Sequence, residues 1–381
     1  LAWGDYGMFA CDFDQIDTWG GQCFTPTNLV FKKSVYAFDG MLISLGSNIS
    51  SSGSYGDDRV TATNLFQEVG SDMGNLNING TMMSSGDADK ELTSETDTWI
   101  VTPKGTGYFI PKGNDNVVVK YGEQEGPNED GSDVDSPATA IATKAYISHG
   151  VKPTDKDYVF VMVPRTTAEK MQNLASELAN DGGERYTILS QTDKFHALTY
   201  KPAGITAYAF FEAVDDTKLS VVKAVGSEML LMQRPQADGS LHLAVCNPNL
   251  RPQSKSSSLG DWLPGTTETT ITLEGEWYTD MVAEGFKINA PENGQTVIEL
   301  TLNHGLPIYI QVGPEGYTSS FDSEEIEKDW LKVSRSGEEM IVELTQPSSN
   351  ATFVELYSID GIKTGSEILN PGTQKGSVKL Q

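Results

Sequence analysis

The sequence contains few of the residues that most often carry catalysis or bind metal ions. Its 381 residues include three cysteines and four histidines, and no HExxH, CxxC, phosphate-binding loop or GxSxG pattern occurs. The histidines are far apart in the chain: His149, His196, His242 and His304. Residues distant in sequence can converge in a fold, but spacing alone reveals no metal, nucleotide or nucleophile site.

Each histidine also has a structural interpretation. His196 and His242 alternate with apolar neighbours, which predicts hydrogen-bonded histidines within a sheet. His149 is expected on a turn that it holds by hydrogen bonds, and His304 in a hairpin turn. These interpretations are favoured over catalysis for all four residues.

Long apolar runs are absent as well. None approaches the roughly 20 residues of a membrane-spanning helix, and the chain shows neither a signal peptide nor an initial methionine. It opens on a segment typical of a strand, so we expect a mature product or a fragment of a longer protein.

Basic residues are outnumbered. There are 53 acidic and 27 basic side chains, giving a net charge of −26. Such a chain repels nucleic acid and anionic membranes, and we expect neither as a partner. It also repels sulfated glycans, so binding one would require a local basic patch or a partner domain.

The cysteines give no metal-binding spacing. Cys11 and Cys23 bracket a short segment, and either a disulfide or two free thiols fits this spacing. Cys246 ends an apolar strand, which predicts a buried free thiol.

Two acidic segments are candidates for binding a structural calcium ion. No other metal and no cofactor is expected. Asp12, Asp14 and Asp17 offer the oxygen ligands that calcium prefers, without the spacing of an EF-hand. Glu123–Pro137 is predicted to be an exposed acidic loop. Solvated carboxylates are the favoured interpretation in both segments.

Alternating β-branched and aromatic residues fill most of the chain. Within Leu29–Gln67, Asp39-Gly40 separates two such runs and predicts a type I′ hairpin turn. The second run, Met41–Leu45, is expected to break at Gly46-Ser47-Asn48. A third run at Val60–Phe66 then predicts an antiparallel meander.

Further short strands with turn residues between them predict an all-β fold. We expect an antiparallel multi-sheet super-sandwich followed by smaller β-sandwiches. One isolated helix is predicted near 167–181, with a Thr166–Glu169 capping box and Gly182-Gly183 as its end.

The expected domains are a central super-sandwich at 1–184 and a second sandwich at 185–313. A linker at 314–322 leads to a small accessory or sorting-type sandwich at 323–381. The segment VELYSIDGIKTG resembles the carboxyl-terminal secretion-and-sorting modules of Gram-negative surface proteins.

Several ordered blocks between about residues 8 and 312 carry a wider resemblance. They are Lys33–Phe38, Leu45–Ile49, Thr63–Gln67, Ile78-Asn79-Gly80 with Trp99 and Gly107-Tyr108, Ala145–Gly150 with Asp157–Pro164, and Ala244–Asn249. Together they resemble the polysaccharide lyases that cleave chondroitin and hyaluronan, in particular the chondroitin sulfate ABC lyases. His149 lies in one of these blocks, where it matches a fold motif.

The resemblance implies the β portion of a secreted, extracellular, periplasmic or cell-surface lyase of a Gram-negative bacterium. Such enzymes bind a glycosaminoglycan through an amino-terminal helical toroid and cleave it by β-elimination at uronic acid. The toroid carries the essential His, Tyr and Arg, so the resemblance assigns no catalytic residue to this chain. The expected role is to wall the cleft and brace the toroid, and the chain alone is expected to be inactive.

Two alternatives belong to other functional classes. One is a carbohydrate-binding module that uses tryptophans as a stacking platform: Trp19, Trp99, Trp262 or Trp277. The other is a structural surface protein. A broad cleft with basic side chains such as Lys33, Lys144 or Arg165 would argue against it.

Overall fold

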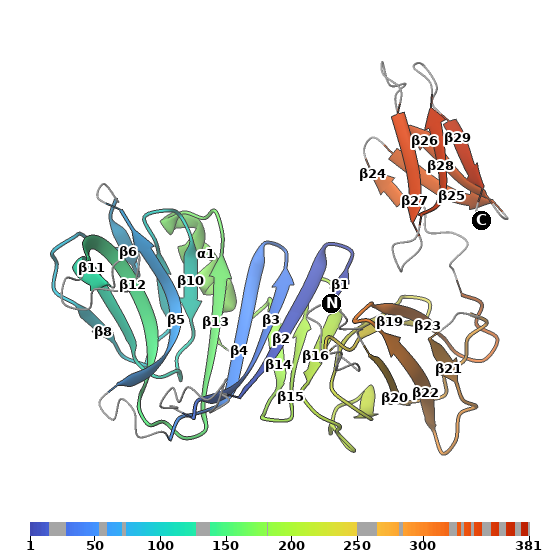
Figure 1. The fold of residues 1–381 in the computed structure, drawn as a ribbon, viewed down its shortest axis with the longest axis horizontal. Helices are drawn as coiled ribbons and strands as arrows, with labels where there is room; N and C mark the ends of the chain where they lie inside the picture. Colours follow the sequence, from blue (N-terminus) through green and yellow to red (C-terminus); the bar gives the residue numbers. More distant parts are fainter. Residues whose placement is uncertain are drawn as a thin grey trace, which may run out of the picture. The chain divides into compact units, whose positions relative to one another are not determined.

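The computed structural model describes the chain in segments. These are residues 1–14, 28–52, 59–70, 74–126, 138–180, 182–249, 265–281 and 285–319, and the strands between 326 and 379. The described residues form antiparallel strands and one helix, α1 (Ala168–Leu178), which confirms the predicted fold class (Figure 1). Among them, no helix has the length and apolar character that a membrane crossing requires.

The chain divides into two compact units. The first comprises Leu1–Asp215 and Val225–Arg234, and the second comprises Asp216–Ala224 and Pro235–Gln381. The predicted domain limits at 184 and 313 and the linker at 314–322 stay predictions.

A nine-stranded sheet, here called the central sheet, forms the framework of the first unit. Every neighbouring pair in it is antiparallel. Its strands, in spatial order, are β1 (Ala2–Trp3), β2 (Tyr6–Asp14), β3 (Val30–Phe38), β4 (Met41–Ser50), β13 (Lys156–Val163), β10 (Gly107–Ile110), β9 (Thr98–Val101), β6 (Leu76–Ile78) and β7 (Thr81–Met83).

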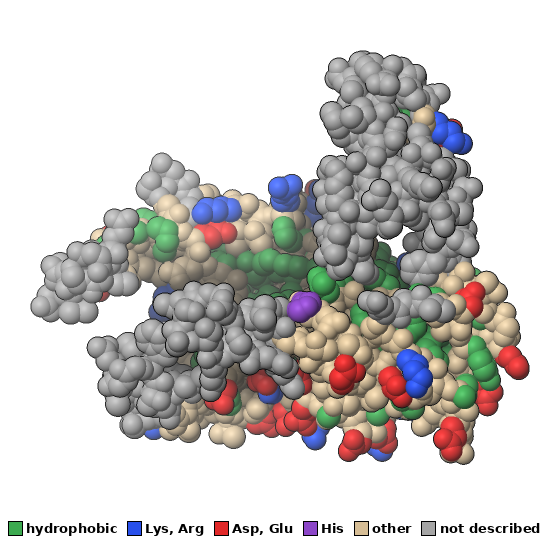
Figure 2. Space-filling model, turned by 45° about the vertical axis from the view of Figure 1, so that its right-hand side comes forward, with side chains coloured by type: hydrophobic (Ala, Val, Ile, Leu, Met, Phe, Trp, Pro, Cys, Tyr) green, Lys and Arg blue, Asp and Glu red, His purple; other side chains and the backbone are tan. Residues whose placement is uncertain are grey.

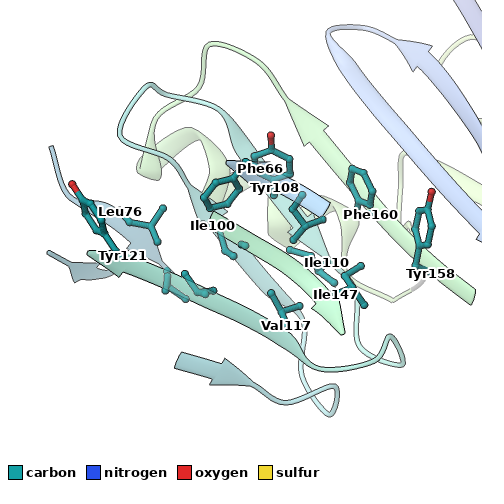
Figure 3. Close-up of a cluster of buried hydrophobic side chains, with 14 of the residues drawn as sticks. Phe66, Leu76, Ile100, Tyr108, Ile110, Val117, Tyr121, Ile147, Tyr158 and Phe160 are labelled. Carbon is teal, nitrogen blue, oxygen red and sulfur yellow. The ribbon is translucent and has the colours of Figure 1, made fainter. Parts of the chain in front are cut away.

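A four-stranded sheet, the covering sheet, packs on one face of the central sheet. Its order is β5 (Val60–Val69), β12 (Ala138–Val151), β11 (Val117–Gly126) and β8 (Lys90–Leu92). Side chains of both sheets meet in one buried cluster, including Tyr108, Ile110 and Phe160 of the central sheet and Phe66 and Ile147 of the covering sheet (Figure 3). This burial of apolar surface holds the two sheets together.

The opposite face of the central sheet is covered by other elements. The rear sheet consists of β14 (Tyr186–Gln191), β15 (Phe195–Tyr200), β16 (Ile205–Phe210) and β18 (Met229–Pro235). Phe38 of β3 stacks on Tyr200 with ring centroids 4.6 Å apart, and the Tyr200 hydroxyl donates to Asp39 Oδ2 at 2.6 Å. The rear sheet therefore packs beneath the β1–β4 half of the central sheet.

The predicted hairpin is confirmed, whereas the meander is wrong. Asp39 and Gly40 both have positive φ, 44° and 75°, as a type I′ turn requires. Strand β4 does not break at Gly46 but continues to Ser50, because Gly46 leaves room for the Tyr158 ring packed on it. Since β13 pairs with the other edge of β4, β5 joins the covering sheet instead.

The helix occupies the place where it was predicted, but its first turn differs. Its N-cap is Thr167, whose side chain accepts from Lys170 N, so the predicted Thr166–Glu169 capping box is wrong. Thr166 is buried instead, and its methyl group and Met171 both lie against Gly107 of β10. Gly182 donates to the Leu178 carbonyl just beyond the helix end.

The acidic segment predicted as a loop is partly a strand. Glu123 to Gly126 extend β11 and pair with β12 as far as Ala138. Cross-strand backbone hydrogen bonds outweigh the acidic composition there, because side chains at the end of a hairpin still reach water. Residues 127–137 lie outside the described residues.

The second unit contains smaller sheets. Within it β19 (Leu241–Cys246) pairs with β23 (Ile308–Val312), and a second sheet has the order β17 (Val222–Val225), β20 (Thr266–Glu274), β22 (Gln295–Asn303) and β21 (Phe286–Ile288). Strands β17 and β21 were not predicted. The sequence of Gly275–Tyr278 also predicts a strand, and this prediction is wrong, because Gly275 has a φ of +102° and only Tyr278 forms a bridge.

The carboxyl-terminal strands form a four-stranded and a two-stranded sheet. Their bounds are β24 (Ile326–Lys328), β25 (Leu331–Ser336), β26 (Glu339–Leu344), β29 (Lys375–Lys379), β27 (Thr352–Tyr357) and β28 (Lys363–Leu369). The assignment of this segment as an accessory or sorting-type module stays a prediction.

Candidate functional site

One half of the central sheet has a face that the covering sheet does not bury. Side chains along a strand alternate between faces, and directly paired residues share a face. Cys11, Lys33, Gly46 and Tyr158 form one such row across β2, β3, β4 and β13. Tyr158 belongs to the core beneath the covering sheet, so the same face continues outward over β3 and β2.

This uncovered part, the open face, is defined by Phe9, Cys11, Phe13, Phe31, Lys33 and Val35. Phe9 is 58% exposed and Phe13 is 37% exposed, which is unusual for phenylalanine. Phe13 stacks on Phe31 at 4.7 Å between centroids, and Phe31 packs against the buried cluster. A contiguous exposed aromatic patch typically marks an interaction surface.

The chain presents a hydrophobic surface band amid its acidic side chains. In the view of Figure 2, green side chains form a band and most red side chains lie outside it. In a chain with a net charge of −26, a surface with few carboxylates is where an anionic partner meets least repulsion.

The three basic side chains proposed from sequence do not gather in one cleft. Lys33 lies on the open face, opposite Cys11. Lys144 lies on β12, where the residues on either side of it, Thr143 and Ala145, are fully buried, so its own side chain points outward. Arg165 is exposed in the turn before α1. Only Lys33 therefore belongs to the candidate surface.

Sequence reasoning named Lys33 and missed the aromatic residues beside it. The signal was present in Phe9, Cys11 and Phe13, which alternate with Ala10 and Asp12. Their exposure could not be read from this pattern, because an alternating apolar row equally fits a buried face.

The tryptophans do not form one platform. Trp99 is 9% exposed within the central sheet, which removes it as a stacking residue. Trp277 is half-buried in the second unit. Trp19 and Trp262 lie outside the described residues.

His196 is the hydrogen-bonded sheet histidine that its apolar neighbours predict. The ring is fully buried between the central and rear sheets. Its Nδ1 lies 2.7 Å from Ser34 Oγ and its Nε2 lies 2.8 Å from Ser47 Oγ. Burial lowers the pKa of His196 to about 3, so the ring is neutral at physiological pH. It joins the two sheets and faces no solvent.

His149 lies within strand β12 and not on a turn, which corrects the prediction. Its Nε2 is 2.8 Å from Thr63 Oγ1, and its Nδ1 is 2.9 Å from Asp115 Oδ2. Lys156 Nζ donates to the other Asp115 oxygen at 2.8 Å. His149 lies in a strand because β12 continues to Val151 and pairs with β5 over that stretch. The network thereby ties the covering sheet to β13 of the central sheet.

Asp115 is the centre of this network. Burial acts to raise its pKa, but the hydrogen bonds from Lys156 and His149 outweigh burial and hold the pKa below its usual value. The carboxylate is therefore ionised and acts as an acceptor for both neighbours.

Replacing Asp115 with asparagine is expected to destabilise the first unit by about 2 kcal/mol, because two charge-assisted hydrogen bonds are lost beside a buried imidazole. Urea denaturation read by amide hydrogen exchange in β11 and β12 measures this. Asp89→Asn is the control, since Asp89 pairs with Lys120 at the surface and its side chain is 56% exposed. Equal effects of the two substitutions would contradict a structural role for the network.

A polar hollow of about 470 Å³ lies beside this network, where β13 faces β14. Gln191 Nε2 donates to the carbonyls of Gly46 and Tyr158, and Asn114 Nδ2 donates to the Pro111 and Val159 carbonyls. These amides are thus engaged in holding strands together. The hollow is therefore the space between two packed sheets.

The described residues contain no group of three or more His, Cys, Asp or Glu arranged to hold a metal ion. Asp12 pairs with Lys32, and Asp17 of the proposed calcium cluster lies outside the described residues. Cys246 is a buried free thiol, as predicted. Cys11 is also free and half-buried, and Cys23 is not described.

Solved structures with a similar arrangement of stacked antiparallel sheets include polysaccharide lyases. Paenibacillus xanthan lyase matches with a TM-score of 0.61 and 17% identity, over 99% of this chain and 40% of that chain. A chondroitinase AC lyase matches with a TM-score of 0.56 and 15% identity, over 80% of this chain and 38% of that chain. At these identities the likeness shows the fold.

Sequence comparison indicates the same class. Residues 1–175 are similar to polysaccharide lyase family 8, super-sandwich domain. The chondroitin sulfate ABC endolyase of Proteus vulgaris is 26% identical over 314 residues, which are 82% of this chain and 28% of the relative. The chondroitin sulfate ABC exolyase of that organism is 28% identical over 282 residues, 68% of this chain and 26% of the relative. The chain thus spans about a quarter of the length of these relatives.

Proposed function

We propose that this chain is the β portion of a secreted, periplasmic or cell-surface lyase of a Gram-negative bacterium. The enzyme would cleave chondroitin or dermatan sulfate, or hyaluronan, by β-elimination at uronic acid. The open face would wall one side of the substrate cleft and brace an amino-terminal helical toroid. The exposed aromatic row on β2 and β3 is the observation that carries the proposal.

The reaction requires groups that the open face does not supply. A base removes the C5 proton, a cation or strong donor neutralises the carboxylate, and an acid protonates the leaving O4. On the open face, Lys33 is the single ionisable side chain besides Cys11. As the resemblance to the lyase family implies, the catalytic His, Tyr and Arg would lie on the toroid.

The composition of the open face suits a wall and brace. Phe9 and Phe13 offer apolar area that a helical partner would bury. Lys33 offers one ammonium group toward an anionic sugar chain in a protein that is otherwise strongly acidic. The partner domain would supply the remaining positive charge.

The 381-residue chain, incubated with chondroitin 4-sulfate, dermatan sulfate or hyaluronan, is expected to form no unsaturated uronate, measured by its ultraviolet absorbance. Mixing it with a separately produced helical domain of the same protein is expected to restore product formation. Turnover by the isolated chain would overturn the proposal.

Phe9→Asp tests the wall directly, because it places a negative charge on a surface meant for an apolar or anionic partner. We expect restored activity to fall at least about tenfold. Val69→Asp is the matched control, since Val69 is exposed to a similar extent, 55%, on β5 of the covering sheet. Equal loss in both variants would contradict the assignment of the open face.

A further inference from the structure

Trp277 in the second unit is held in a fixed orientation. Its Nε1 donates to the Glu274 carbonyl at 2.7 Å, and its backbone N donates to Thr296 Oγ1 at 2.9 Å. A Cβ at Gly275 would lie 3.0 Å from the indole Nε1, so the ring lies close above that glycine. The side chain is nonetheless half-buried and not enclosed, which leaves part of the indole accessible.

Trp277 lines a hollow of about 410 Å³. Its other walls include Met281, Phe286, Ile288 and Pro291. Phe286 and Ile288 belong to the edge strand β21, on the face that pairs with the buried residues of β22. The volume lies within the usual range of small-ligand sites, roughly 300–1,000 Å³.

Two residues that line this hollow, Lys287 and Asn289, have polar side chains that contact Glu299 beside it. Asn289 Nδ2 donates to Glu299 Oε1 at 3.0 Å, and Lys287 Nζ lies 3.4 Å from Glu299 Oε2. The Asn289 amide and the Lys287 ammonium hold the pKa of Glu299 below its usual value, so it is ionised. Lys287 and Glu299 balance one another, so the polar groups beside the hollow carry no net charge.

We propose that this hollow binds a pyranose unit of an unsulfated glycan, as an anchoring site separate from the open face. An accessible aromatic ring flanked by neutral donor–acceptor pairs matches a sugar, which has apolar C–H faces and hydroxyl edges. The balanced charges and the acidic chain disfavour a sulfated ring. The choice of a glycan as ligand rests on the proposed lyase function, whereas the site is defined by the second unit alone.

Isothermal titration of the full 381-residue chain with unsulfated chondroitin hexasaccharide tests the proposal. Wild-type binding is expected, with weaker binding of the chondroitin 4-sulfate hexasaccharide. Trp277→Ala is expected to raise Kd about tenfold, the equivalent of one lost stacking contact. Trp277→Phe keeps an aromatic ring and is expected to retain most of the affinity, which separates stacking from misfolding.

Val69→Ala on the covering sheet, outside both surfaces, is the control and is expected to leave the Kd unchanged. Phe9→Ala is measured beside it, because Phe9 belongs to the open face. Absence of binding by the wild type, or equal Kd values for wild type and Trp277→Ala, would overturn the anchoring site. Loss of binding in Phe9→Ala with retention in Trp277→Ala would also overturn it, while supporting the proposed role of the open face. Failure of the mixing experiment described above would leave this measurement unaffected.

Discussion

Lowering the pH from 7 to 4 is expected to cost the first unit about 3 kcal/mol of stability through His196 alone. The unfolded chain binds a proton at this ring near the ordinary pKa of 6.5, whereas burial lowers the folded pKa to about 3. The contribution is therefore fully present above 6.5 and is lost progressively as the pH falls toward 3. Urea denaturation at several pH values, read by hydrogen exchange in β15, measures the slope.

His196→Gln removes the titrating group and is expected to flatten this slope between pH 4 and 6.5. Asp115 contributes little in that window, because a lowered carboxyl pKa costs most of its stability below its ordinary value of 3.8. His304→Gln is the control, since His304 is exposed in the turn between β22 and β23. An unchanged slope in His196→Gln would show that the buried ring does not cause the pH dependence of stability.

Gly46→Ala is expected to destabilise the first unit by about 3 kcal/mol, the upper part of the usual range for overpacking. An added Cβ would lie 2.1 Å from Cε1 of Tyr158, whose ring is 5% exposed beneath the covering sheet. The ring cannot move outward without opening the buried cluster. The measurement is urea denaturation, with hydrogen exchange in β4 and β13 reporting on the first unit.

Gly126→Ala supplies the matched control, because Gly126 is also in a strand and a Cβ there meets no atom within 4 Å. We expect its effect to stay within about 0.5 kcal/mol. Combining Gly46→Ala with Tyr158→Leu is expected to recover part of the loss, since the smaller side chain makes room. Equal effects of the two glycine substitutions would contradict a packing role for Gly46.

Local chemistry made several elements predictable. Asp39-Gly40 specifies a turn whose two central residues have positive φ, and the hairpin forms there. Gly182 likewise follows the end of α1, where a glycine is favoured. Each signal acts over a few residues and needs no distant partner.

Distant contacts decided the elements that were mispredicted. Gly46 looked like a strand break, but the ring of Tyr158, more than 100 residues away, packs on it and the strand continues. His149 was expected on a turn because Gly150 follows it, yet pairing with β5 extends β12 through both residues. Strand β21 has three residues, too few for a periodic pattern to be visible.

The candidate surfaces could be predicted only in part from the sequence, because they too depend on contacts between distant segments. Lys33 and Trp277 could be named from residue type, because an isolated lysine or tryptophan is conspicuous in a sequence. Phe9 could not, because its exposure depends on where the covering sheet ends over the central sheet.

The sequence by itself determined that the chain forms antiparallel sheets, one helix and specified turns, since periodicity and backbone preference act locally. It also carried enough ordered blocks for the resemblance to the lyase family to be recognised. Tertiary structure alone decided which strands share a sheet, which aromatic residues remain at the surface and how each buried histidine is hydrogen-bonded. Those outcomes depend on pairing and burial between segments far apart in the chain, and no local pattern encodes such pairing.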